Sequence, residues 1–250
     1  MTRPGDRLPF RAVTNFRDIG GYPSRLGGQI RRGVLFRSDG LQDLAGADLE
    51  LYRSLGIVVA FDLRRDSEAA RRPNPVPTTR LCMMEAVERA GGSTPKRSEV
   101  VTTLDGETMM RDGYRAMVSH SAETIARVIG EVGRGTHPAV FHCHGGKDRT
   151  GVVAAVILDL LGVDRTSVLD DYELTSRYRH FEDQISSFNE LRASGLADEA
   201  AMAVLGTPRW AMAEALELVD EMGGSFAYLR EQGGLDTETL GRFTELMLDR

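Results

Sequence analysis

The sequence predicts an α/β fold built in three layers, with a helical C-terminal part. Three observations predict it. Short β-branched apolar runs alternate with helical patterns early in the chain, a strand leads through a glycine-containing loop into a strongly apolar helix, and the residues after 164 are mostly helical in pattern. At 250 residues, a domain of this kind buries a core without disulfides. We therefore expect a single domain over residues 1–250.

Short patterns predict the elements in the first third of the chain. Residues 28–38 indicate a hairpin-like segment that ends in a strand over 34–37. A helix is expected from about 47 to 55, because Gly56 follows as a stop signal. Residues 57–63 are a β-branched apolar run without helical spacing, which indicates a buried strand. Residues 66–72 then predict one or two helical turns, and 79–84 a further strand.

The middle of the chain begins with a segment that has no periodicity. Residues 88–106 predict either a loop of the length found in active-site lids or a simple surface excursion. Helices resume near Glu107. An apolar helix face then follows at i, i+3, i+4 and i+7, formed by Ile125, Val128, Ile129 and Val132.

A strand, a loop and a buried helix follow one another directly. The strand is expected over 138–142, the loop over 143–149 and the helix over 150–161. In the helical C-terminal part, Thr207 followed by Pro208 gives a clear start signal for a helix.

Composition and charge exclude several classes of protein. The net charge is −6, and no block of Lys or Arg is long enough for a nucleic-acid footprint, so we expect no nucleic-acid partner. The longest apolar run, 152–158, is too short to span a bilayer, so no integral membrane segment is expected. The N-terminus lacks the apolar core of a secretory signal, and two cysteines, Cys82 and Cys143, fit a reducing compartment. We expect a cytoplasmic protein and leave open export without a signal.

The loop after residue 142 carries the chemistry of the chain. Cys143 and Arg149 lie six positions apart with two glycines between them. A glycine-containing turn that leads into a helix N-terminus directs backbone N–H groups and the positive end of the helix dipole at one point, which suits a phosphate dianion and a thiolate. Cys143 is therefore the predicted nucleophile, and the planar fork of Arg149 can hold two phosphoryl oxygens.

Two neighbours of Arg149 extend this prediction. The hydroxyl of Thr150 could donate to the sulfur when a phosphocysteine intermediate is cleaved. Both displacement steps also need a group that moves a proton, and Asp148 lies within the loop itself.

The ten residues from His142 to Gly151 resemble the signature loop of the tyrosine and dual-specificity phosphatase superfamily, which has Cys, five residues, Arg and Thr. The rest of the chain resembles one bacterial branch, the atypical tyrosine phosphatases related to secreted virulence phosphatases of mycobacteria and Listeria. The segments that carry this resemblance are NFRDIGGY at 15–22, RGVLFRSDGL at 32–41, FDLR at 61–64 and FAYL at 226–229. The resemblance implies a tyrosine-phosphatase-like fold with a central, mixed and mostly parallel sheet flanked by helices.

The resemblance also implies an activity and an acid. Such enzymes are cysteine-dependent hydrolases of phosphotyrosine, phosphoserine or phosphothreonine proteins and of phosphoinositides. From the loop and the lack of a zinc ligand set we also expect no metal and no cofactor. The Lys-Asp-Arg sequence known in the loop of this branch is matched by Lys147, Asp148 and Arg149, which assigns Asp148 as the general acid. In other branches the acid lies on a separate upstream loop, which makes Asp112 the alternative and Asp105 a further one.

The substrate pocket is expected to be formed by the loop and its surroundings. His144, Gly145, Gly146 and Lys147 are the predicted contacts, and Lys147 would suit a multiply phosphorylated head group. Position 144 is His where relatives commonly have an apolar or basic residue. Residues 165–205 could include a helical lid of the kind found in some relatives, or an ordinary packed helical tail.

Several alternatives stay open at this point. Asp62 and Arg64 either touch the substrate and brace the loop from a neighbouring strand or form a simple ion pair at a strand end. Zinc is disfavoured because no second Cys or His pair accompanies Cys143, and His142 is better explained as a residue that orients the thiolate. The alternative function is a phosphate-binding module that has lost turnover.

Overall fold

A five-stranded sheet forms the centre of the protein. The computed structural model describes residues 3–84, 106–179, 181–193 and 195–250. The strands lie in the order β1 (Arg17–Asp18), β3 (Leu35–Ser38), β6 (Ala139–His142), β4 (Val59–Asp62) and β5 (Thr78–Arg80). Only β1 runs antiparallel to its neighbour in this sheet, so the sheet is mixed and mostly parallel. The predicted fold class is confirmed.

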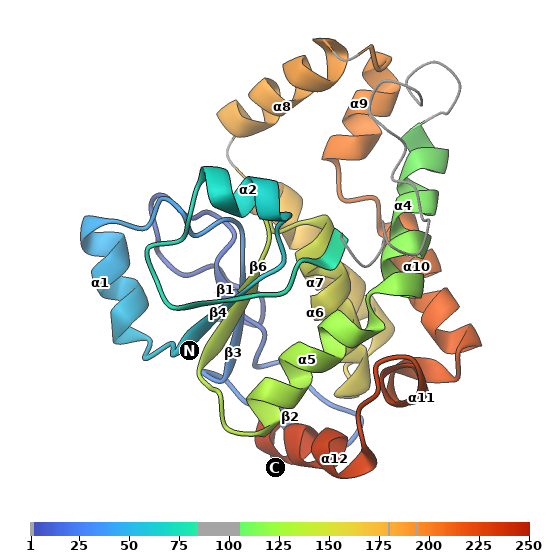
Figure 1. Ribbon diagram of the computed structural model, residues 1–250. Coiled ribbons are helices and arrows are strands. Elements are labelled where there is room, and N and C mark those ends of the chain that lie inside the picture. The colour runs from blue at the N-terminus through green and yellow to red at the C-terminus, as the bar shows by residue number, and fades with distance from the viewer. Residues whose placement is uncertain (1–2, 85–105, 180, 194) are drawn as a thin grey trace.

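The three central strands are buried on both faces, which explains their near-continuous apolar sequences. Successive side chains of a strand point to opposite faces, so each strand supplies two cores. Phe36, Ala60 and Val140 pack on the face covered by α1 (Gly46–Ser54). Their neighbours in sequence pack on the opposite face, against α5 (Ala122–Gly133) and α6 (Asp148–Leu160). Figure 1 shows these layers on either side of the sheet.

The carboxyl ends of the parallel strands meet at one edge of the sheet. Ser38 on β3 and Asp62 on β4 both lie opposite His142, the last residue of β6. The short helix α2 (Asp66–Arg71) follows β4 at this edge. Side chains from four separate segments are thus brought to the start of the loop that follows β6.

Most of the chain after β5 that the structure describes is helical. Helix α4 (Gly106–His120) packs against α9 (Asp198–Leu205) and α10 (Arg209–Glu221), and α12 (Thr237–Met247) packs against α5. The C-terminal helices are α7 (Arg165–Tyr178), α8 (Phe181–Ala193), α9 (Asp198–Leu205), α10 (Arg209–Glu221), α11 (Gly224–Glu231) and α12 (Thr237–Met247). None of the helices in the described ranges is long and apolar enough to cross a membrane.

The structure corrects the predicted hairpin at 28–38. Strand β2 (Gln29–Ile30) pairs with β7 (Leu248–Asp249) in a separate two-stranded sheet, and β3 pairs with β1 and β6. The two halves of the supposed hairpin therefore lie in different sheets. The hairpin was predicted from closeness in sequence, whereas the real partner of β2 lies at the far end of the chain.

Other boundaries differ by smaller amounts. The strand expected over 79–84 is the shorter β5, and α10 begins at Arg209, just after the predicted start signal. The buried helix after the loop begins at Asp148 and not at residue 150, and Lys147 is its N-cap. The loop or lid predicted over 88–106 lies outside the described residues, apart from Gly106 at the start of α4.

Candidate active site

The loop between β6 and α6 runs from Cys143 to Lys147 and is packed tightly against β3. Gly146 adopts a φ of +62°, a backbone conformation that favours glycine. A Cβ atom there would lie 2.7 Å from the side-chain nitrogen of Asn15 and 2.8 Å from the carbonyl oxygen of Ser38. Gly146 is therefore required by the close approach of two neighbouring segments.

Cys143 lies in a pocket of about 270 Å³ at the N-terminus of α6. The residue is 2% exposed. The loop and α6 contribute Cys143, His144, Gly145, Lys147, Asp148 and Arg149 to the lining, and α2 contributes Glu68. The other side is formed by the α8 and α9 region, through Arg179, Ser187, Glu190, Leu191, Val204 and Leu205.

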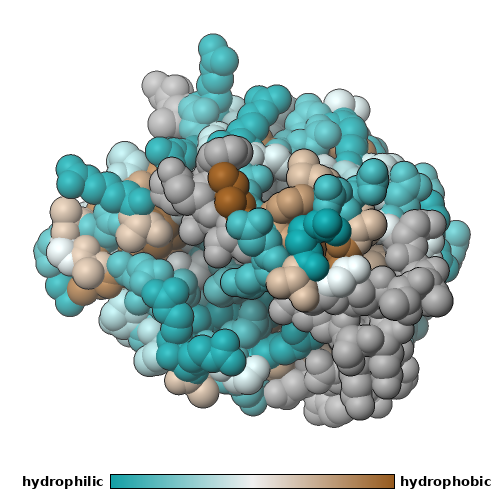
Figure 2. All heavy atoms as spheres, turned by 90° about the horizontal axis from the view of Figure 1, so that it is seen from above, coloured by the Kyte–Doolittle hydropathy of each residue, from teal (hydrophilic) through white to brown (hydrophobic). Residues whose placement is uncertain are grey.

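Helices α8 and α9, within the predicted lid segment, lie at the end of the molecule that carries α2 (Figure 1). Viewed onto this end, the described surface is mostly hydrophilic (Figure 2). His144 and Gly145 line both the Cys143 pocket and a neighbouring pocket of about 280 Å³ that includes Asp39 and Arg72. Polar side chains thus surround the entrance to the site.

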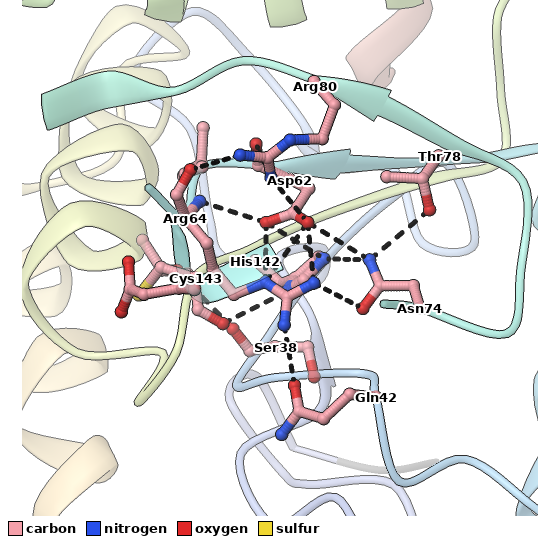
Figure 3. Close-up of polar contacts among 12 residues, drawn as sticks. Ser38, Gln42, Asp62, Arg64, Asn74, Thr78, Arg80, His142 and Cys143 are labelled. Atoms are coloured by element: carbon pink, nitrogen blue, oxygen red, sulfur yellow. Dashed lines mark hydrogen bonds and ion pairs between the residues drawn. The ribbon is translucent and has the colours of Figure 1, made fainter. Parts of the chain in front are cut away.

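His142 is held behind the loop by two hydrogen bonds (Figure 3). The side-chain nitrogen of Asn74 lies 2.9 Å from Nε2, and the carbonyl oxygen of Cys143 lies 3.1 Å from Nδ1. An amide nitrogen only donates and a carbonyl only accepts, so the proton of the neutral ring is on Nδ1. Burial lowers the pKa of His142 to about 4, although the nearby Asp62 opposes this shift. The imidazole is therefore neutral near pH 7 and fixes the backbone at Cys143.

Asp62 and Arg64 form a buried ion pair beside His142, with Nη2 of Arg64 2.8 Å from Oδ2 of Asp62. Each side chain is 1% exposed, and Arg80 makes a second ion pair with Asp62. Burial raises the pKa of Asp62, but the opposing effect of Arg64 and His142 is larger. The net result is a pKa of about 2, below the ordinary value. Neither side chain is among the residues that line the Cys143 pocket, and both lie beside His142 behind the loop.

Arg149 is bound by Glu68, a residue that the sequence did not single out. Oε2 of Glu68 lies 2.6 Å from Nη1 of Arg149, and Oε1 lies 3.1 Å from Nη2. Burial raises the pKa of Glu68, but the hydrogen bonds and charge of Arg149 lower it to about 2, so the carboxylate is ionised. The sequence signal that could have identified Glu68 is the pair of acidic residues in the first turn of α2. Acidic residues are also common in the first turns of ordinary solvent-exposed helices, so this signal does not distinguish Glu68 as a site residue.

Asp148 lies in the first turn of α6 and is 40% exposed on the side chain. Its Oδ1 accepts a 2.8 Å hydrogen bond from the hydroxyl of Tyr114 on α4. Burial and the charge of Asp148 raise the pKa of Tyr114, so the phenol stays protonated and donates. The hydroxyls of Tyr114 and Tyr172 are also hydrogen bonded to each other. The loop carboxylate is thus fixed by a buried tyrosine from another helix.

Lys147 lines the Cys143 pocket and also contacts the helix on its other side. Its Nζ donates to the carbonyl oxygens of Val204 and Gly206, the latter at 2.9 Å, and lies 3.1 Å from Oδ1 of Asp148. The side chain therefore contacts the C-terminal end of α9 and the neighbouring carboxylate. It connects the loop to the helix that faces it across the pocket.

Neither Thr150 nor Asp112 is among the residues that line the Cys143 pocket. The hydroxyl of Thr150 is buried and lies 3.5 Å from the carbonyl oxygen of Ser38. Asp112 is exposed on α4, whereas Asp105 lies outside the described ranges. Across the part of the chain that the structure describes, no three His, Cys, Asp or Glu side chains are grouped so that they could hold a metal ion.

Comparison with known proteins places this site in a family. Residues 8–249 match the model of the tyrosine phosphatase family. The triple specificity protein phosphatase PtpB of Mycobacterium tuberculosis is 29% identical, over 94% of this chain and 96% of that protein. A Cupriavidus necator protein provisionally named a tyrosine-protein phosphatase is 26% identical, over 93% of this chain and 86% of that protein.

One solved structure is also similar. The crystal structure of Pseudomonas aeruginosa TpbA has 18% sequence identity and a TM-score of 0.33, over 72% of this chain and 87% of that chain. The family match spans nearly the whole sequence and includes the loop from Cys143 to Arg149. The chain belongs to the tyrosine phosphatase family and is a cysteine-dependent phosphatase.

Proposed function

We propose that the chain hydrolyses phosphotyrosine in proteins, with Cys143 as nucleophile, Arg149 as phosphate-binding residue and Asp148 as general acid. The observation that carries the proposal is that these three side chains line one pocket at the N-terminus of a buried helix. Backbone N–H groups and the helix dipole favour an anion there.

The first step transfers the phosphoryl group to sulfur. The thiolate of Cys143 attacks phosphorus, the bond from phosphorus to the substrate oxygen breaks, and Asp148 gives its proton to that oxygen. The free alcohol or phenol leaves. Arg149 binds two oxygens of the group in transfer and stabilises the charge that develops on them.

The second step releases phosphate. A water molecule attacks the phosphorus of phosphocysteine and gives a proton to Asp148, and the bond between phosphorus and sulfur breaks. Inorganic phosphate leaves and the thiolate is restored. The hydroxyl of Thr150, which is bonded at 3.5 Å to Ser38, would have to turn toward the sulfur to assist this step.

Phosphoserine, phosphothreonine and phosphoinositides are proposed as further substrates. The name of the M. tuberculosis relative describes it as a triple specificity protein phosphatase, which supports a broad range. The polar lining around His144, which includes Arg72 and Arg179, and the hydrophilic surface at this end of the molecule support phosphorylated head groups as well as peptides as substrates (Figure 2). Helices α8 and α9 would cover the substrate as a lid, since residues of both helices line the pocket.

Cys143, in the pocket, is a free thiol within the described residues. Free thiols persist in reducing compartments, and a thiolate nucleophile needs one. We therefore propose that the enzyme acts in the cytoplasm or is exported in reduced form.

Turnover of phosphotyrosine, phosphoserine and phosphothreonine peptides and of phosphoinositide vesicles, each with a chelator present, tests the proposal. Phosphotyrosine should be hydrolysed by the native chain and not by Cys143→Ser. Asp148→Asn should lower kcat by roughly 10²- to 10⁴-fold. A larger loss in folded Asp112→Asn would transfer the acid to α4, and phosphate binding without any turnover would favour the binding-module alternative.

A further inference from the structure

A cluster of buried charges lies beneath the phosphate-binding loop, and the reaction steps above do not use it. Arg17 on β1, Arg37 on β3 and Asp171 on α7 are each at most 1% exposed. Arginine is rarely buried to this extent unless it is paired, because removing its charge from water is costly. We call these three residues the buried arginine cluster.

Asp171 is the shared partner of both arginines. Nε of Arg17 lies 3.1 Å from Oδ1 of Asp171, and Nη1 of Arg37 donates to Oδ2. Burial raises the pKa of Asp171, but the two arginines lower it to about 2, so it is ionised. Tyr22 donates to the same carboxylate as a neutral phenol, because burial and the charge of Asp171 raise its pKa.

The cluster therefore holds two positive charges against one negative charge. A nearby half-buried carboxylate, Asp39, accepts hydrogen bonds from Thr14, Asn15 and Ser38 rather than from either arginine. Nε of Arg37 is buried and has no hydrogen-bond partner within the described residues.

Arg37 also contacts the loop directly. Its Nη2 donates to the carbonyl oxygen of Gly146 at 3.0 Å, and Nδ2 of Asn15 donates to the same oxygen at 3.0 Å. In a planar trans peptide the C=O and the following N–H point in opposite directions. Holding the Gly146 oxygen against Arg37 therefore turns the N–H of Lys147, the N-cap of α6, away from the cluster.

The position of Arg37 in the sheet brings its charge close to the nucleophile. Arg37 on β3 lies opposite Phe141 on β6, two residues before Cys143. A unit charge about 10 Å away in an effective dielectric constant of about 20 shifts a titration by roughly one pH unit.

We propose that Arg37 is a positioning residue for the phosphatase reaction: it orients the Gly146–Lys147 peptide for anion binding, and its buried charge stabilises the Cys143 thiolate and the bound phosphoryl group. This inference rests on the proposed role of Cys143. Arg37 does not touch the substrate and acts through the loop.

The test measures the alkylation of Cys143 by iodoacetamide as a function of pH, resolved by peptide mass spectrometry, with Cys82 as the internal reference. Inorganic phosphate is the probe for anion binding, through its inhibition constant. In Arg37→Gln, the midpoint of the Cys143 curve should rise by about one pH unit, and phosphate inhibition should weaken roughly tenfold. The Cys82 curve should not move.

Three further variants separate charge from simple structural support. Arg37→Lys keeps the charge and should restore the midpoint to within a few tenths of a pH unit of the native value. Asp171→Asn increases the positive excess and should move the midpoint down. Tyr22→Phe removes an uncharged contact to the same carboxylate and should leave the curve unchanged.

The outcomes are distinct. An unchanged midpoint in folded Arg37→Gln would overturn the inference while leaving Cys143 as nucleophile, and so would upward shifts in both Arg37→Gln and Asp171→Asn. Full turnover in Cys143→Ser would instead overturn the proposed function. If Arg37→Gln does not fold, the other two variants decide. The inference is supported when the midpoint of Arg37→Lys matches the native value and the midpoint of Asp171→Asn is lower. It is contradicted when the midpoint of Arg37→Lys departs from the native value and that of Asp171→Asn is not lower.

Discussion

The carboxylate of Glu68 binds both terminal nitrogens of Arg149, at 2.6 Å for Nη1 and 3.1 Å for Nη2. A guanidinium group presents a second edge, formed by Nε and Nη2, that can bind two oxygens of a phosphoryl group. No acceptor among the described residues bonds to Nε of Arg149. Glu68 can therefore fix the plane of the guanidinium and leave this edge for the substrate.

Replacement of Glu68 by Gln should lower kcat/KM by roughly tenfold, because the neutral amide offers Arg149 only one acceptor and no charge. Steady-state kinetics with a phosphotyrosine peptide measure the effect. Glu190→Gln is the matched control, since Glu190 lines the same pocket on α8. If Glu68→Gln instead binds inorganic phosphate more tightly than the native enzyme, Glu68 competes with the substrate and does not position Arg149.

Replacement of Tyr114 by Phe should lower kcat by about tenfold with little change in KM, because it removes the hydroxyl that holds Asp148 at 2.8 Å. In the Asp148→Asn background the same change should have almost no effect, since the proton donor is already lost. Tyr172→Phe is the control, because Tyr172 contacts Tyr114 and makes no hydrogen bond to Asp148 in the described structure. Additive losses in the double variant would show that Tyr114 acts by another route.

The elements that sequence reasoning predicted well are those whose signal is local. The strands β4 and β6 have short apolar sequences that must be buried on both faces of a parallel sheet, and the loop has a fixed spacing of Cys143, two glycines and Arg149. The strand, the loop and the helix N-terminus follow from these few residues, because each is determined by its neighbours in sequence.

The features that it missed depend on contacts between distant segments. Glu68 approaches Arg149 only because β4 and β6 are adjacent, and β2 pairs with β7 at the opposite end of the chain. Lys147 carries no local sign that its side chain ends at the carbonyl oxygens of Val204 and Gly206. A charged residue in a motif can bind a substrate or another helix, and the sequence does not distinguish these roles.

Replacement of Lys147 by Met tests which role is correct. The ammonium group at the C-terminal end of α9 should stabilise that helix by about 1–2 kcal/mol, since it is 5% exposed and bonded to two carbonyl oxygens. Its loss should accelerate hydrogen exchange of residues 198–206 by roughly 5- to 30-fold. Asp148→Asn keeps these bonds and should leave the exchange of α9 unchanged. Unchanged exchange in Lys147→Met, with weaker binding of phosphoinositide vesicles, would support substrate binding by Lys147.

Buried and paired ionisable groups should make the stability of the protein depend on pH in two ranges. The pKa values of Glu68, Asp62 and Asp171 are each about 2 in the folded protein, below their ordinary values of 4.5, 3.8 and 3.8. Such carboxylates stabilise the folded state fully above their ordinary values, and this contribution is lost as the pH falls toward 2. Their effect is therefore confined to pH values below about 4.5.

His142 accounts for the higher range. Its pKa falls from an ordinary 6.5 to about 4 because the ring is buried, so below pH 6.5 the unfolded chain binds a proton that the folded protein does not. The contribution of His142 to the free energy of unfolding, measured by urea denaturation, should be constant above pH 6.5. It should fall by on the order of 3 kcal/mol as the pH is lowered from 6.5 to 4. His142→Gln should lower stability at pH 7 but remove much of this slope, while the decline below pH 4 remains. An equally steep decline from 6.5 to 4 in His142→Gln would assign it to other groups and leave the neutral state of His142 unsupported.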